Sequence, residues 1–204
     1  MKILLTAFDP FGGETINPAL EAVNAVQEKI GPASIVKVTV PTVFGRSVEV
    51  VTEAIRGEQP DAVLMIGQAG GRCAITPERV AINVSDARIA DNDGNMPDDE
   101  PIVKDGPAAY FSTLPIKAMV ERIRSIGIPA AISNTAGTFV CNQLMYGVLH
   151  MLQNEYPEVI GGFMHVPFAP EQTAKQTRPE PSMSISDITA GIEAALEAII
   201  EAME

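Results

Sequence analysis

The sequence predicts an α/β fold in which helices cover both faces of a largely parallel sheet. Short apolar runs alternate with longer stretches of helical periodicity, which is the pattern of strand–helix–strand crossover units. The apolar runs are almost unbroken by polar residues, as expected of parallel strands that are buried on both faces. The 204 residues contain no internal repeat and no change of composition that marks a linker, so residues 1–204 are predicted to form one domain.

Three strands and two helices are expected in the first third of the chain. Residues 2–7 (KILLTA) and 62–67 (AVLMIG) are mostly apolar, and residues 34–40 are rich in β-branched side chains, so each segment is predicted to be a strand. Residues 18–30 have apolar side chains at helical spacing, with Asn17 as the N-cap and Pro18 at the first helical position. Residues 46–56 form the next predicted helix, which Gly57 closes.

Three more strands and three more helices are expected after residue 67. The strands are predicted over residues 80–84, 130–133 and 162–166. A helix is predicted from Pro115 to residue 126, just before Gly127, and two others cover residues 142–152 and 188–203. Residues 86–106 and 169–184 are polar and rich in turn-forming residues, so they are expected to be surface loops or lids.

The composition excludes several classes of partner and site. Lys and Arg number 14 against 26 Asp and Glu, so the formal net charge is −12, which disfavours nucleic acid or an anionic membrane as a partner. Two cysteines cannot build a disulfide framework, and with two scattered histidines they make a poor zinc site, so no metal is expected. The N-terminal apolar run ends at Asp9, and no run reaches the length of a membrane span, so we expect a cytoplasmic protein with free thiols.

Cys141 is the strongest candidate for a nucleophile. It lies in SNTAGTFVCNQLMYGV, after a predicted strand and a glycine-containing turn, where a helix begins. The positive end of a helix dipole is expected to lower the pKa of the thiol, and free N–H groups in the first turn can hold an oxyanion. The alternative is a buried structural cysteine, which is the commoner fate of a free thiol. Cys73 has no activating context and is expected to be structural.

A cysteine nucleophile needs a base, and the chain contains only two histidines. His150 lies inside a predicted helix among apolar neighbours, where a packing role is the simpler interpretation. His165 lies at the end of the predicted strand GFMHV. Because ligands of an open parallel sheet bind beyond the carboxyl ends of its strands, His165 is the preferred partner of Cys141.

A third group should orient the imidazole and stabilise its charged form. Glu78, in ITPERVAIN, borders an apolar segment, where a carboxylate that faces the core needs a partner. The alternative is a surface ion pair with the adjacent Arg79. Asp86, Asp91 and Asp93 are weaker candidates, and the DNDG sequence among them lacks the remaining ligands of a calcium-binding loop.

The glycine-rich segment GQAGG follows the predicted strand AVLMIG. It lacks the G-x-G-x-x-G spacing of a dinucleotide-binding turn, and the residues after it are not helical in pattern. We therefore interpret the glycines as allowing close approach of the backbone to a substrate, and we expect no cofactor.

Five segments, in the same order and spread over most of the chain, resemble the pyroglutamyl-peptidase I (pyrrolidone-carboxylate peptidase) family of cysteine peptidases. They are TAFDPFGGETINP (6–18), GQAGGR with ITPERVAIN (67–83), DARIADNDG (86–94), ISNTAGTFVCNQLMY (132–146) and GFMHVPFAPEQ (162–172). The combination of ERVAIN, AGTFVCN and HVPF is highly specific. The resemblance implies a single-domain three-layer α/β/α sandwich with a mostly parallel twisted sheet, in a cytoplasmic homotetramer.

The resemblance also implies a reaction and a set of site residues. The family hydrolyses the bond after an N-terminal pyroglutamate (5-oxoproline) of a peptide, through a thioester acyl-enzyme. Cys141 would be the nucleophile, His165 the general base and acid, and Glu78 the residue that orients His165, while Arg88 and the backbone N–H of Cys141 would hold the oxyanion. The residues implied to bind the lactam are Phe8, Phe11, Asn17, Gln68, Phe139 and Val140. For Phe8 and Phe11 the alternative is an ordinary core position.

Two other functions are compatible with the same residues. A different amidase, or a transferase that forms a thioester, could use the Cys141–His165 pair without acting on pyroglutamyl substrates. A non-catalytic binding module on a scaffold like that of nucleoside phosphorylases would leave Cys141 unreactive.

Overall fold

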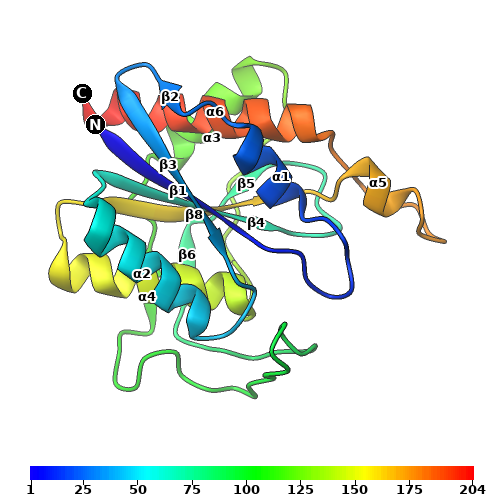
Figure 1. The fold of residues 1–204 in the computed structure, drawn as a ribbon, viewed down its shortest axis with the longest axis horizontal. Helices are drawn as coiled ribbons and strands as arrows, with labels where there is room; N and C mark the ends of the chain where they lie inside the picture. The colour runs from blue at the N-terminus through cyan, green and yellow to red at the C-terminus, as the bar shows by residue number, and fades with distance from the viewer.

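A six-stranded sheet lies between two layers of helices (Figure 1). The computed structural model describes all residues from 1 to 204. The strand order in the sheet is β2-β3-β1-β4-β8-β5, and β6 and β7 form a separate two-stranded sheet. In chain order the elements are β1 (Lys2–Phe8), α1 (Pro18–Ala25), β2 (Lys29–Ile30), β3 (Ala33–Val40), α2 (Arg46–Glu58), β4 (Ala62–Gln68), β5 (Thr76–Pro77), β6 (Val80–Ile82), β7 (Ala109–Phe111), α3 (Ile116–Ser125), α4 (Val140–Glu155), β8 (Ile160–Val166), α5 (Pro170–Thr173) and α6 (Ile185–Met203).

The long central strands β3, β1, β4 and β8 run parallel, whereas the two-residue edge strands β2 and β5 run antiparallel to their neighbours. Helices α1, α3 and α6 cover one face of the sheet, and α2 and α4 cover the other (Figure 1). Along β1, Ile3 and Leu5 pack beneath the first group of helices, and Leu4 and Phe8 beneath the second. Both faces of the strand are therefore buried, which explains its continuous apolar sequence. The predicted α/β fold with a mostly parallel sheet between two helical layers is confirmed.

The helix predicted over residues 18–30 is too long. Asn17 is the N-cap as expected, because its side chain accepts a hydrogen bond from the N–H of Ala19, but α1 ends at Ala25. Lys29–Ile30 instead pairs with β3 across a turn in which Gly31 has a φ of 54°. The apolar side chain of Ile30, which fits the helical spacing, packs against the core from this edge strand.

The segment 130–133 is not a regular strand but makes two isolated parallel bridges, Ile75 with Ala130 and Glu78 with Ser133. The N–H of Ala131 bonds to the carbonyl of Ile75, and the N–H of Ser133 bonds to that of Pro77. Pro77 has no N–H to return a bond, so the ladder is interrupted at this residue. The predicted strand 80–84 is shortened to β6, which pairs with the unpredicted β7 rather than with the main sheet.

The other predicted elements match the observed ones to within three residues at each end. Helix α2 continues through Gly57, and Gln59, with a φ of 49°, takes the left-handed position that was expected at Gly57. Pro115 is the N-cap of α3 rather than its first residue. The loop predicted over 169–184 includes the short helix α5, and residues 86–106 contain neither helix nor strand. None of the helices combines the length and the apolar character that crossing a membrane requires.

Candidate active site

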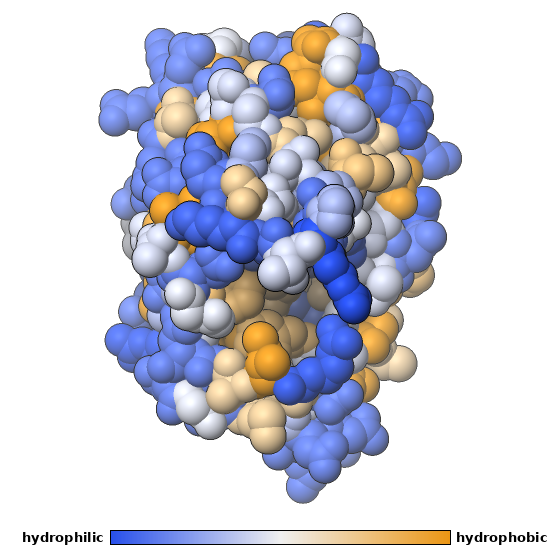
Figure 2. Space-filling model, turned by 90° about the vertical axis from the view of Figure 1, so that its right-hand side faces the viewer, coloured by the Kyte–Doolittle hydropathy of each residue, from blue (hydrophilic) through white to orange (hydrophobic).

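The carboxyl ends of the central strands open onto a face that is hollowed at its centre, with apolar side chains in the wall of the hollow (Figure 2). Gly67 on β4 and His165 on β8 are register partners near these strand ends. A Cβ atom at Gly67 would lie 3.1 Å from Sγ of Cys141. The thiol therefore lies against β4 at the residue that pairs with His165, which places Cys141 and His165 at the same end of the sheet.

Helix α4 positions Cys141. Phe139 is the N-cap and Val140 the first helical residue, so Cys141 is the second. The N–H groups of the first turn have no partner within the helix and can bind an anion. The side chain of the preceding Val140 is completely buried and anchors the turn in the core.

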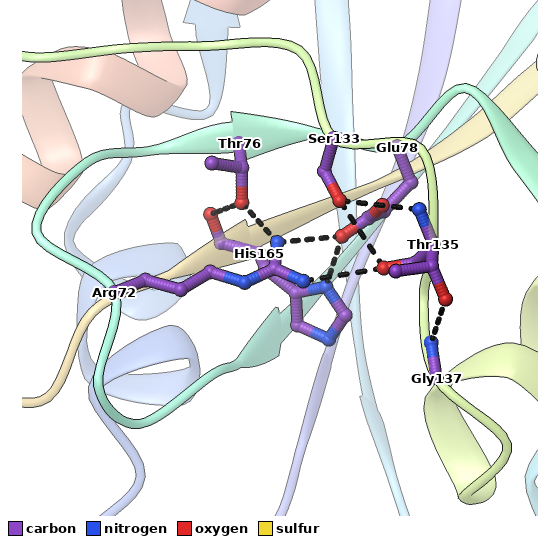
Figure 3. Close-up of polar contacts among 7 residues, drawn as sticks. All are labelled: Arg72, Thr76, Glu78, Ser133, Thr135, Gly137 and His165. Atoms are coloured by element: carbon purple, nitrogen blue, oxygen red, sulfur yellow. Dashed lines mark hydrogen bonds and ion pairs between the residues drawn. The ribbon is translucent and has the colours of Figure 1, made fainter.

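Glu78 holds His165. The Nδ1 atom of His165 lies 2.7 Å from Oε1 of Glu78, and the two side chains are 4 % and 0 % exposed (Figure 3). A carboxylate can only accept at this contact, so the neutral imidazole carries its proton on Nδ1 and leaves Nε2 as the basic atom. In Figure 3 the other ring nitrogen points away from Glu78. The backbone N–H of Glu78 bonds to the carbonyl of Phe163, which fixes Glu78 beside β8.

The charged partner of Glu78 is Arg72, which was not predicted. Its Nη1 atom lies 2.7 Å from Oε1 of Glu78 (Figure 3). The alternative of a surface ion pair between Glu78 and Arg79 is wrong, because Glu78 is fully buried and Arg79 donates from Nε to Asn134. The available signal was the position of Arg72 at the end of the glycine-rich turn GQAGGR, which returns the chain to this end of the sheet.

Burial dominates the pKa of the nucleophile candidate. Burial raises the pKa of the Cys141 thiol to about 12, the nearby Glu78 carboxylate adds to the rise, and the positive charge of Arg72 opposes it. The backbone N–H at the start of the helix acts to lower this pKa, as expected, but the net shift is upward. Loss of water around the sulfur and a neighbouring negative charge together outweigh the helix dipole.

The pKa values of the other two groups complete the resting state. Burial lowers the pKa of His165, although its hydrogen bond to Glu78 acts in the opposite direction. Burial alone would raise the pKa of the Glu78 carboxyl, but its interactions with His165, Ser133 and Arg72 outweigh this and hold it below the ordinary value. At neutral pH the site thus contains a neutral thiol, a neutral imidazole and an ionised carboxylate.

A cleft of about 570 Å³ opens beside the N-terminus of α4. Its lining residues are Asp86, Arg88, Ile89, Gly137, Thr138 and Phe139. The Phe139 ring also contacts Phe11, with ring centroids 6.4 Å apart, and Phe44, with ring centroids 5.2 Å apart in an edge-to-face arrangement. Phe44 was not predicted. The cleft therefore combines an aromatic side chain, Phe139, with an exposed cation, Arg88, beside the start of the helix that carries Cys141.

The remaining residues predicted to bind the lactam lie in less accessible positions. Phe8 is 2 % exposed and packs on Phe163, so it occupies the core position that was its alternative. The Asn17 amide is buried, accepting from Ala19 and donating to the carbonyl of Asp9, which places it in support of the Phe8–Phe11 loop. The side chain of Gln68 accepts a hydrogen bond from Gln172 at the end of β4.

The rejected candidates have structural partners of their own. His150 lies nine residues after Cys141 on α4, about 13 Å along the helix, with Nδ1 2.8 Å from the hydroxyl of Tyr110. Asp91 accepts from the N–H groups of Asp93 and Asn95 and organises its own loop. Cys73 is a free and exposed thiol, so the structural role expected for it is not one of packing in the core. No three His, Cys, Asp or Glu side chains are grouped so that they could hold a metal ion.

Comparison with known proteins identifies a single family. The sequence pattern of the family described as "Pyroglutamyl peptidase" matches residues 1–202. A pyrrolidone-carboxylate peptidase of Clostridium perfringens is 56% identical over 200 residues, covering 98% of this chain and 93% of the relative. The crystal structure of pyroglutamyl peptidase I from Bacillus amyloliquefaciens superposes with a TM-score of 0.95 at 53% identity, covering 98% of this chain and 97% of the other. A pyrrolidone carboxyl peptidase from Pyrococcus furiosus gives a TM-score of 0.96 at 42% identity, with both chains fully covered.

Proposed function

The chain belongs to the pyroglutamyl peptidase family, and on that premise we propose that it removes N-terminal pyroglutamate from peptides with a Cys141–His165–Glu78 triad. The observation that carries the triad is the buried contact of 2.7 Å between His165 and Glu78 at the end of the sheet that also holds the Cys141 thiol. A nucleophile, a base and an orienting carboxylate from three segments are the parts that covalent acyl transfer needs.

The resting pKa values define the order of the first step. Because burial keeps the thiol neutral, the proton passes from Sγ of Cys141 to Nε2 of His165 as the sulfur attacks the carbonyl carbon after the lactam ring. The imidazolium that forms is stabilised by the Glu78 carboxylate at Nδ1. The carbonyl oxygen becomes an oxyanion, which the backbone N–H of Cys141 and the Arg88 guanidinium stabilise.

Collapse of this intermediate breaks the carbon–nitrogen bond. His165 returns its proton to the leaving amine, and the shortened peptide departs, leaving a thioester on Cys141. A water molecule then attacks the thioester carbonyl while His165 takes one of its protons. The proton returns to the sulfur as the carbon–sulfur bond breaks, and free pyroglutamate leaves the regenerated site.

The cleft favours a small, flat, uncharged ring. Phe139, whose ring contacts those of Phe11 and Phe44, supplies an apolar surface for the lactam. The backbone of Gln68 and the loop that Asn17 supports are proposed to bind the lactam N–H and C=O. A site that hydrogen-bonds the ring carbonyl discriminates strongly against proline, which lacks it, because the protein groups would remain unpaired.

The test is turnover of two fluorogenic substrates by the full chain. Pyroglutamyl-7-amido-4-methylcoumarin is expected to be hydrolysed with a kcat/KM about 10³-fold or more above that of the prolyl analogue. Mass spectrometry of the quenched reaction is expected to show the protein carrying one pyroglutamyl group on Cys141. If no coumarin is released from the pyroglutamyl substrate, the remaining interpretation is a non-catalytic binding module. Equal release of coumarin from both substrates would favour a less specific amidase.

Gly67→Ala is expected to impair the reaction and the fold together. The new methyl group would lie 2.7 Å from the Phe163 ring and 3.1 Å from Sγ of Cys141, so one of them has to move. We expect a loss of about 1–3 kcal/mol in the free energy of unfolding, measured in urea, and a fall in kcat of roughly tenfold. Gly57→Ala is the matched control, because a Cβ there meets nothing within 4 Å and full activity is expected. Wild-type kcat in Gly67→Ala would contradict the close packing of thiol and strand.

Other parts of the proposal rest on the family resemblance alone. We propose that residues 1–204 act as one catalytic domain and that four copies assemble. A cytoplasmic location is likewise a prediction from the sequence.

A further inference from the structure

The guanidinium of Arg72 connects three segments that each supply part of the site. Nη1 donates to Oε1 of Glu78 and to the hydroxyl of Thr76, and Nη2 donates to the carbonyl of Thr135, 3.2 Å away (Figure 3). Thr76 pairs with His165 between β5 and β8, and its hydroxyl donates to the His165 carbonyl. Thr135 belongs to the turn that leads into α4 and Cys141.

We propose that Arg72 is a positioning residue of the peptidase: it fixes the Glu78 carboxylate against His165 and sets how strongly that carboxylate can hold a proton on the imidazole. The proposal rests on the proposed function, because it concerns the same triad. All the hydrogen bonds of the Arg72 guanidinium go to groups of the protein, Glu78, Thr76 and Thr135, so its role is to position Glu78 and, through Glu78, His165.

The contacts of Arg72 depend on the planar, forked shape of its guanidinium. One planar group meets a carboxylate, a hydroxyl and a backbone carbonyl in fixed directions, which the single ammonium of a lysine cannot reproduce. The Arg72 side chain is 27% exposed whereas Glu78 is completely buried, so the guanidinium brings a partly hydrated positive charge to a carboxylate that water does not reach. An ionised carboxylate at this depth needs such compensation.

The charge of Arg72 also limits the basicity of His165. The ionisable groups that act on His165 are Glu78, which favours the imidazolium, and Arg72, which disfavours it. From α4 the site also receives the Cys141 thiol, which is neutral at rest. Both charged groups share a single oxygen, Oε1, so part of the negative charge available to His165 is already neutralised by Arg72. Removing Arg72 should therefore raise the pKa of the imidazole.

The experiment compares Arg72→Met, Arg72→Lys and the matched control Arg79→Met. The control removes the same charge from a nearby arginine that donates to Asn134 instead of Glu78. For Arg72→Met we expect kcat to fall about 10- to 100-fold with little change in KM, and the acid limb of the kcat/KM profile to move to higher pH by roughly half a unit to one unit. Arg72→Lys should restore most of the pH midpoint but only part of kcat, and Arg79→Met should match the wild type in both.

A second measurement does not depend on turnover. The chain has only two histidines, so the ring signals of His165 in heteronuclear NMR can be assigned by comparison with His165→Gln. Arg72→Met should raise the pH at which His165 titrates. An unchanged His165 titration in a folded Arg72→Met protein, or an equal shift in Arg79→Met, overturns the role of Arg72. If the His165 titration shifts but the wild type shows no Cys141-dependent hydrolysis, the effect of Arg72 on His165 is supported and the proposed function is overturned.

Discussion

Cys141→Ala is expected to reduce the hydrolysis of pyroglutamyl-7-amido-4-methylcoumarin by about 10⁴-fold or more in kcat, because no other group can form the covalent intermediate. The thiol is neutral and small, and its removal should change the free energy of unfolding by no more than about 1 kcal/mol. Thermal melting of the variant therefore separates lost chemistry from lost structure. The pyroglutamyl adduct in the mass spectrum should also disappear.

Cys73→Ala is the matched control, because it removes the only other thiol in the chain. Cys73 is exposed and its neighbour Arg72 makes the polar contacts of this segment, so the variant should keep wild-type kcat and KM. Residual hydrolysis by Cys141→Ala within tenfold of the wild type would exclude Cys141 as the nucleophile. Loss of activity in Cys73→Ala, with activity retained in Cys141→Ala, would show that Cys73 is the nucleophile.

The fold was largely predictable because its strands are buried on both faces. Segments such as AVLMIG have a continuous apolar sequence that only a central strand or a buried helix explains, and the glycines and prolines around them settle the choice. The predicted elements are wrong where pairing with a distant strand, and not the local pattern, decides the secondary structure. Lys29–Ile30 joined an edge hairpin, and the bridge at Pro77 was interrupted by a missing N–H, neither of which periodicity encodes.

The site was predictable only in part, for a related reason. Scarcity selected Cys141 and His165, since the chain has two residues of each type. Adjacency in the sequence instead favours Arg79 as the partner of Glu78, whereas the return of the chain after GQAGG brings Arg72 to the carboxylate. The direction of the thiol pKa shift was not predictable, because a helix N-terminus is visible in sequence but the surroundings of the sulfur, with the Glu78 carboxylate nearby, are not.

Glu78→Gln is expected to lower kcat by about 10²- to 10⁴-fold. A triad carboxylate replaced by its amide can present an N–H to the imidazole and so favour the wrong tautomer, with Nε2 protonated and unable to accept the thiol proton. The same change leaves the Arg72 guanidinium without its anion. Because that side chain is partly hydrated, the cost in unfolding free energy should be about 1–3 kcal/mol rather than the full cost of a buried unpaired charge. Steady-state kinetics and urea denaturation measure the two effects separately.

The pH dependence distinguishes Glu78 from Arg72, because their charges act on His165 in opposite directions. Without the carboxylate the imidazole loses the interactions that raise its pKa, so the acid limb of the residual kcat/KM should move to lower pH in Glu78→Gln and to higher pH in Arg72→Met. A common direction in both variants would contradict the shared contact at Oε1.

Stability should follow the same groups. The folded protein holds the pKa of Glu78 below its ordinary 4.5, so the carboxylate stabilises the fold above that pH, and the contribution disappears as pH falls through the folded value. The pKa of His165 lies below 6.5 in the fold, so between the folded value and 6.5 the unfolded chain binds more protons and stability rises with pH. Both effects make the wild type sensitive to acid. In Glu78→Gln the loss of stability that sets in below about pH 4.5 should be absent. If the urea concentration at the unfolding midpoint depends on pH in that range as it does in the wild type, Glu78 carries no such linkage.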